Sequence, residues 1–87
     1  MNKNPIRTHR EALELSVAEL AAALGVSVGL IGLWERGRYV PPRRRQEQLA
    51  RLLGVDEPRL ASDLAQFRSQ LIQSATEKLA VALVRRP

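Results

Sequence analysis

The sequence contains no cysteine and a single histidine, His9. Without cysteine there is no disulfide scaffold, no thiolate nucleophile and no Cys–His pair, and the usual zinc-finger ligand sets cannot be assembled. The chain also has only two aspartates, Asp56 and Asp63, and no glycine-rich phosphate loop. No metal or cofactor site can be identified and no nucleophile–base pair is available, so we expect a protein that is not an enzyme.

Long apolar runs are missing as well. The opening residues, MNKNPIRTHRE, contain no apolar run, and no stretch approaches the roughly 18 consecutive apolar residues that a bilayer requires. We therefore expect a cytoplasmic protein that does not contact a membrane. At 87 residues the chain has room for one small domain with an arm, and the thin core of so small a domain favours association with a partner chain.

Positive charge is in excess, and arginine supplies most of it. There are 14 Lys and Arg residues against 9 Asp and Glu residues, a net charge of +5, and 12 of the cations are arginine. The planar arginine fork pairs bidentately with phosphate, so this bias indicates nucleic acid before it indicates an acidic protein. The same excess in a merely solubilising surface is the alternative interpretation.

Apolar residues recur at three- and four-residue spacings, and glycine and proline fall only between such runs, which predicts an all-α fold. A first helix over about residues 5–14 begins where Asn4 caps it and Pro5 takes the first position. A fourth helix begins at about Pro42 and ends at Gly54.

Between these helices lie two short ones that only three residues separate. Ser16–Glu19 forms a capping box at the start of one helix, and Gly25 stands where that helix needs a left-handed residue to end. Ser27 then caps the next helix, which runs to about Arg36 before Gly37. This spacing predicts a helix-turn-helix, in which the tight turn aims the second helix outward.

The last predicted helix begins at Asp56 and is apolar along one side. If continuous, it has about 28 residues and a length of roughly 40 Å, but a second capping-box pattern at Ser74–Glu77 leaves a break near residue 73 open. A small bundle cannot cover so long a stripe, so we expect two copies to pair through it, antiparallel or crossed. The chain then divides into a helix-turn-helix domain at 1–55 and an oligomerisation segment at 56–87. The stripe consists of Leu60, Leu64, Phe67, Leu71, Leu79 and Leu83.

With the turn in place, residues 6–55 resemble the Xre/Cro-type helix-turn-helix domain of lambdoid phage repressors. The string that carries the resemblance is ELAxxLGVSxxxIxxWERG, supported by Arg10, Pro41 and the Leu53–Val55 segment. The resemblance implies a compact four- to five-helix lambda-repressor-like bundle that binds double-stranded DNA as a dimer. It also implies that the third helix enters the major groove, that the start of the second meets a phosphate, and that Arg10 and Glu35 form an ion pair. We expect that pair to be part of the scaffold.

The resemblance and the charge pattern together select the candidate DNA-binding residues. Arg43–Arg45 open the fourth helix, where the helix dipole disfavours cations, so a phosphate would satisfy both the helix end and the guanidinium groups. A solvated basic face offset by Glu47 is the alternative. The candidates are Ser16, Val17, Ser27, Val28, Gly29, Leu30, Leu33, Arg36, Arg38, Arg43, Arg44 and Arg45.

The third helix, about residues 28–36, departs from the family pattern because polar base-reading side chains are missing from its expected outer face. Such groups are needed to distinguish base pairs directly, and apolar ones reach only the thymine methyl. Three interpretations stay open for Val28, Leu30 and Leu33: thymine contacts with shape readout, an interface for another protein, and tolerated exposure.

The leading hypothesis is a dimeric, repressor-like transcriptional regulator whose paired third helices enter successive major grooves about 34 Å apart. An adaptor or antitoxin that binds a protein partner through the third helix or the C-terminal arm is an alternative, because one fold hosts both uses. An architectural or phage-packaging DNA binder with little sequence preference is another. The operator, the regulated process and the sign of regulation are not encoded in any pattern of this sequence.

Overall fold

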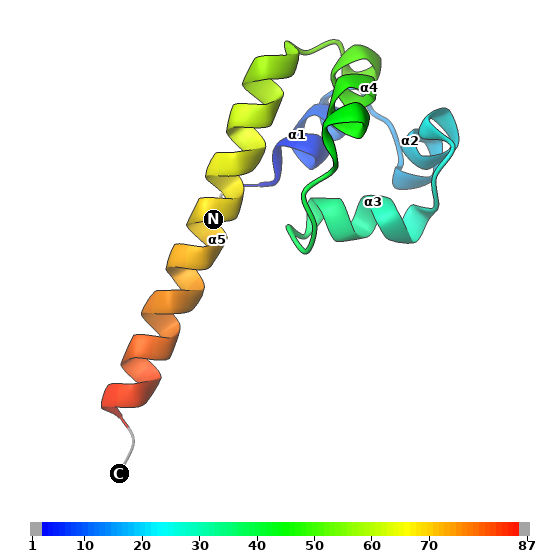
Figure 1. Cartoon of the computed structure of the whole chain (residues 1–87). Helices are drawn as coiled ribbons and strands as arrows, with labels where there is room; N and C mark the ends of the chain where they lie inside the picture. The colour runs from blue at the N-terminus through cyan, green and yellow to red at the C-terminus, as the bar shows by residue number, and fades with distance from the viewer. Residues whose placement is uncertain (1–2, 86–87) are drawn as a thin grey trace.

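The computed structural model describes residues 3–85, which form five α-helices and contain no strand (Figure 1). The expected all-α fold is therefore confirmed. The short helices lie together as a bundle, and the last helix extends far beyond it. The elements are α1 (Pro5–Ala12), α2 (Val17–Leu24), α3 (Val28–Glu35), α4 (Arg43–Leu53) and α5 (Glu57–Val84).

Side-chain caps fix where four of the helices begin. The Asn4 side chain accepts from the Ile6 amide at 2.9 Å, and Ser27 accepts from the Leu30 amide at 3.1 Å. Ser16 and Asp56 act in the same way at α2 and α5. Each cap satisfies an amide that the helix itself cannot pair, which is why these starts can be predicted. The start of α4 differs, because Pro42 occupies the N-cap position and offers no side-chain hydrogen bond.

The first helix ends earlier than the apolar spacing predicts, at Ala12 in place of about residue 14. Leu13 is its C-cap, and Glu14 adopts a positive φ of 57°. That left-handed residue turns the chain back toward α2, and the Leu15 amide donates to the carbonyl of Arg10 at 3.1 Å. The sequence does not signal this end, because the left-handed position is occupied by Glu14 and not by the glycine that usually marks the end of a helix.

The helices α2 and α3 differ in direction by 111° across the break between them. Gly25 adopts a φ of 71° and ends α2, as expected. The small Ala21 and the larger Ile31 are both buried at the contact of the two helices with the core. Within residues 3–85 no single helix has the length and apolarity to cross a membrane, and only this bent pair passes when its two helices are taken together.

The core of the bundle extends into α5. Leu60 and Leu64 are 1% and 4% exposed and belong to the same buried cluster as Leu20, Ile31 and Trp34. Their inclusion in the exposed oligomerisation stripe was therefore wrong, since they pack inside their own chain. The core thus crosses the division expected at residue 55, because α4 and α5 pack against each other and α1 packs against both.

Helix α5 is continuous, and the break considered near residue 73 is absent. In place of a new cap, the Thr76 hydroxyl donates to the Ile72 carbonyl within the helix at 2.8 Å. All described residues after Leu71 are exposed, and Figure 1 shows this part of α5 with no other helix beside it. We call residues 72–84 the distal half of α5. It gives the molecule its length of 51 Å against widths of 24 and 22 Å.

Candidate nucleic-acid interface

Helix α3 packs against the core through two side chains, and its other side is exposed to solvent. Ile31 is fully buried and Trp34 is 2% exposed, whereas Val28 is 53% exposed. Gly29 is exposed, and Gly32 and Leu33 are partly exposed. Leu30, expected to face DNA, packs partly against the core. The uncovered face of α3 therefore consists of glycines and apolar side chains, as the sequence predicts. Leu30 contributes less to it than expected, because it is partly buried.

One cation lies on this apolar face. The Arg36 guanidinium folds back over α3, and a Cβ atom at Gly32 would lie 3.1 Å from its Nη1 atom. The missing side chain at position 32 therefore leaves the space that the guanidinium occupies. The four-residue spacing of Gly32 and Arg36, which places them on the same side of a helix, is the sequence signal for this contact.

Among the described residues Arg36, Arg38 and Arg44 have no acidic partner. Arg36 and Arg38 flank Gly37, whose φ of 74° turns the chain out of α3. Arg43 lies 3.6 Å from Glu47 but keeps 88% of its side chain exposed, so this pair contributes little to holding it. The first turn of α4 contains no acidic residue. Apart from the exposed pair of Arg43 with Glu47, the positive charge of these arginines has no acidic partner in the described part of the chain.

Arg45 has a different environment from its two neighbours. It is partly buried, and its Nη1 atom donates to the Leu24 carbonyl at 3.2 Å and to the Gln48 side chain at 2.9 Å. Leu24 is the last residue of α2, so the contact satisfies one of the carbonyls left unpaired at the end of that helix. Arg45 thus joins α4 to α2 and is committed to the scaffold more than Arg43 and Arg44 are.

The start of α2 is closed by a reciprocal cap. The Glu19 amide donates to Ser16 Oγ at 3.0 Å, and the Ser16 amide donates to Glu19 Oε1 at 2.9 Å. The backbone hydrogen bond from Ser16 lowers the pKa of Glu19, and the hydroxyl of Ser16 adds to the effect. Because Ser16 Oγ serves as an acceptor in the cap, its O–H remains able to donate to an anion. Val17 beside it is partly buried.

An ion pair fixes α3 to α1. Arg10 Nε lies 2.7 Å from Glu35 Oε2 and its Nη2 lies 3.0 Å from Oε1, with 11% and 10% of the two side chains exposed. The hydrogen bond to Glu35 raises the pKa of Arg10, against the effect of burial. A third donor binds the Leu15 carbonyl at 2.8 Å. The pair that the resemblance implied is thus present, and it orients α3 without facing the open side.

Asn4 makes a second connection, to the end of α3. Besides capping α1, its side-chain amide donates to the carbonyl of Trp34 at 3.0 Å, and only 3% of the residue is exposed. The end of α3 is therefore tied to the start of α1. No local pattern could have indicated this contact, since 30 residues separate its two partners.

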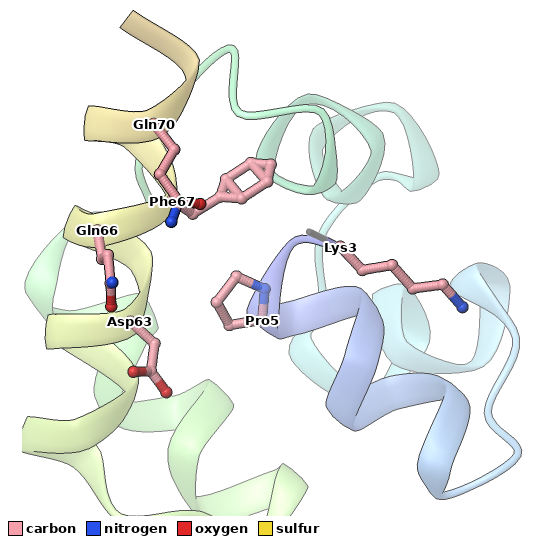
Figure 2. A pocket seen from close by; sticks show the side chains of 6 residues that line it. All are labelled: Lys3, Pro5, Asp63, Gln66, Phe67 and Gln70. Carbon is pink, nitrogen blue, oxygen red and sulfur yellow. The ribbon is translucent and has the colours of Figure 1, made fainter. Parts of the chain in front are cut away.

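A pocket lies between Lys3, Pro5 and α5 (Figure 2). Its volume is about 160 Å³, below the range of about 300 Å³ or more that is usual for ligand sites. Figure 2 shows its α5 residues along one side of that helix, opposite Pro5. The candidate interface is therefore the α3 surface and not this pocket. The pocket is lined by Lys3, Pro5, Asp63, Gln66, Phe67 and Gln70.

Two short helices with a 111° change of direction, the second of them open to solvent, define a helix-turn-helix module. A family model described as a helix-turn-helix domain matches residues 6–62, which is more than half of the chain, and the chain belongs to that family. The match supports a DNA-binding domain of this general kind and does not single out the Xre/Cro type. Comparisons with curated proteins and with solved structures gave no match.

Proposed function

We propose that the chain is a transcriptional regulator that binds double-stranded DNA as a dimer and places α3 in the major groove. The observation that carries the proposal is the open face of α3, which ends at Arg36 and Arg38, two cations without acidic partners among the described residues. A phosphate backbone supplies the negative charge that this surface lacks. The family membership of residues 6–62 supports DNA as the partner.

Affinity comes mainly from phosphate contacts in this proposal. Arg43 and Arg44 lie in the first turn of α4, where the unpaired amides also attract an anion. Arg36 and Arg38 add two cations at the end of α3. The Ser16 hydroxyl and the starts of α2 and α3 supply further phosphate donors. Arg45 has a smaller role, because one of its nitrogen atoms is already bound to Leu24 and Gln48.

Specificity must arise with few direct polar contacts to bases. Val28 and Leu33 can touch thymine methyl groups, and Gly29 lets the helix backbone approach the base edges closely. The spacing of two half-sites and the deformability of the DNA then supply the remaining discrimination. This division of roles follows from the scarcity of side-chain donors and acceptors on the open face of α3.

Dimerisation is assigned to the distal half of α5. Leu79 and Leu83 are 66% and 65% exposed, and Ile72 is 57% exposed on the same side of the helix. Pairing with the same segment of a second copy removes these side chains from water and needs no other partner. Phe67 and Leu71, also in the expected stripe, are partly covered by their own chain, so they contribute less.

The test combines selection of bound fragments from a random DNA pool with a salt titration of binding. Replacing Arg43 and Arg44 together by alanine should weaken binding to all sequences and reduce the slope of log affinity against log salt by about 2. Arg51→Ala with Arg59→Ala is the matched control, because it removes the same charge near the end of α4 and the start of α5. Figure 1 shows that region away from α3, so the slope should stay as in the unmodified protein.

The same experiment separates the competing functions. Absence of binding even in dilute salt overturns the proposal in favour of a protein-binding module. A steep salt slope without any selected sequence overturns the regulator and favours an architectural DNA binder. An unchanged slope in the Arg43→Ala, Arg44→Ala variant means that these two side chains face solvent in the complex.

A further inference from the structure

The turn that follows α3 is held from outside by α5. This turn, residues 36–38, carries Arg36 and Arg38, and the next two residues, Tyr39 and Val40, are 62% and 45% exposed. The amides of the turn bind it to α3, since Gly37 N donates to the Trp34 carbonyl at 3.1 Å and Arg38 N to the Leu33 carbonyl at 2.9 Å. The Arg36 guanidinium lies over Gly32, whereas the carbonyl groups of Gly37 and Arg38 accept hydrogen bonds from α5.

Arg68 reaches the turn from the middle of α5. Its Nη1 atom donates to the carbonyl oxygen of Gly37, at a short distance, and to that of Arg38 at 3.3 Å. Charged donors make stronger hydrogen bonds to carbonyl oxygens than neutral ones do. A single side chain thus holds two successive carbonyl groups of the turn.

Two apolar side chains of α5 pack on the same turn. A Cβ atom at Gly37 would overlap Cδ1 of Leu71 and would lie 3.2 Å from Cε2 of Phe67. Gly37 is therefore needed both for its positive φ of 74° and for the close approach of α5. Phe67, Arg68 and Leu71 together form what we call the turn clamp. All three lie beyond residue 62, where the match to the family ends.

We infer that Arg68 is a positioning residue for DNA binding, which holds Arg36 and Arg38 in the direction that phosphate contact requires. The inference rests on the proposed function and adds to it a part of the chain outside the helix-turn-helix match. The Nη1 atom of Arg68 binds backbone carbonyls, and the turn clamp limits the orientations of the turn in the protein without DNA. Ordering flexible side chains on binding weakens affinity, so an ordered turn strengthens it.

The clamp also connects two functions along α5. Leu71 is the last residue of the helix that the bundle partly covers, and the exposed distal half follows directly. A helix that pairs with a second copy at 72–84 is thereby in contact with the phosphate-binding turn through residues 67–71. The orientation of the turn is thus coupled to the same rigid element that sets the distance between the two copies.

The test measures DNA affinity and salt slope for Arg68→Met and Leu71→Ala in the full chain. Each should weaken binding about fivefold. Leu71→Ala should also flatten the salt slope although it removes no charge, which a role in stability alone would not produce. Arg59→Met, an exposed arginine on the same helix, is the control for loss of one charge. Circular dichroism and sedimentation establish that each variant is folded and has an unchanged oligomeric state.

A double-mutant cycle decides whether Arg68 acts through the turn. In a background that already carries Arg36→Ala and Arg38→Ala, Arg68→Met should cause no further loss of affinity. A full loss in that background means that Arg68 itself contacts DNA and overturns the inference, as do wild-type affinities of both clamp variants. If the unmodified protein selects no DNA at all, the proposed function fails first, and the two failures are therefore distinguishable.

Discussion

At the scale of single residues, the guanidinium of Arg10 is the buried charge that most needs hydrogen-bond partners. It is almost enclosed between α1, α3 and the loop before α2, and its hydrogen bonds go to Glu35 and to the Leu15 carbonyl. A buried charge is tolerated only when its partners are complete. The orientation of α3, and with it the open face, therefore depends on this pair.

We expect Arg10→Met to lower the free energy of unfolding by about 3 kcal/mol, because it leaves the Glu35 carboxylate buried without its partner. The double variant Arg10→Met, Glu35→Met should recover part of that loss, since no charge is left unpaired. Urea denaturation followed by circular dichroism measures all of these values. Arg7→Met is the control, because the pair of Arg7 with Glu11 is exposed and screened by solvent, so its loss should lower stability much less. Equal losses for Arg10→Met and Arg7→Met would contradict the expectation.

The residues that could be predicted from the sequence are those in local patterns or in the resemblance to a known family. The pairing of Arg10 with Glu35 belongs to the second kind. The contacts of Arg68 with Gly37 and Arg38 belong to neither, because 30 or more residues separate them and one arginine among 12 has no distinguishing neighbourhood. The sequence did not distinguish Arg45 from Arg43 and Arg44, because its partly buried environment depends on a contact with α2.

At the scale of helices, the caps explain most of what the sequence could predict. Four helix starts carry a side-chain acceptor one position before the helix, and this signal is local. The end of α1 was missed, because Glu14 takes a left-handed conformation that glycine usually marks. The continuity of α5 could not be decided either, since Ser74–Glu77 has the pattern of a capping box but lies inside the helix.

The cap of α2 should make stability depend on acid pH. The pKa of Glu19 is lowered from its ordinary value of 4.5, mainly by the hydrogen bond from the Ser16 amide. A lowered pKa in the folded state means that the carboxylate contributes stability above the ordinary value, and that this contribution is lost as the pH falls through the folded-state value. The pKa of Glu11 is lowered as well, by its hydrogen bond from Arg7. Its contribution to stability is therefore also lost as the pH falls.

In Glu19→Gln the side chain can still accept the hydrogen bond of the capping box but no longer titrates. We therefore expect its melting temperature to fall less than that of the unmodified protein between about pH 6 and about pH 3. Glu19→Ala, which loses the hydrogen bond too, should melt lower at neutral pH. Thermal unfolding by circular dichroism at several pH values provides the measurement. The same acid-induced fall in Glu19→Gln and in the unmodified protein would show that this cap does not set the pH response.

At the scale of the whole molecule, the shape is set by the distal half of α5. The radius of gyration is 15.1 Å, whereas a compact chain of this length has a value near 12 Å. The segment Leu79–Val84 is apolar at every position and exposed at every position. A small protein does not usually leave so much apolar surface in contact with water, and a second copy covers it most simply. The sequence predicted this stripe, but could not tell that its first two leucines lie in the core.

Leu79→Lys with Leu83→Lys should therefore convert a dimer into a monomer. The unmodified protein is expected to sediment at about twice the chain mass of 9.7 kDa and the variant at the chain mass, because two cations on each copy would face each other across the pairing surface. Gln73→Lys with Ser74→Lys adds the same charge away from Leu79 and Leu83, and should stay dimeric.

Binding to DNA gives the second measurement of this prediction. A dimer gains from engaging two half-sites at once, so the Leu79→Lys, Leu83→Lys variant should bind a paired site about 100-fold more weakly while keeping its affinity for a single half-site. The Gln73→Lys, Ser74→Lys control should show no such difference. If the unmodified protein sediments as a monomer at micromolar concentration, or the leucine variant remains a dimer, the distal half of α5 does not join two copies. The two α3 helices would then lack the fixed separation that reading a paired site requires.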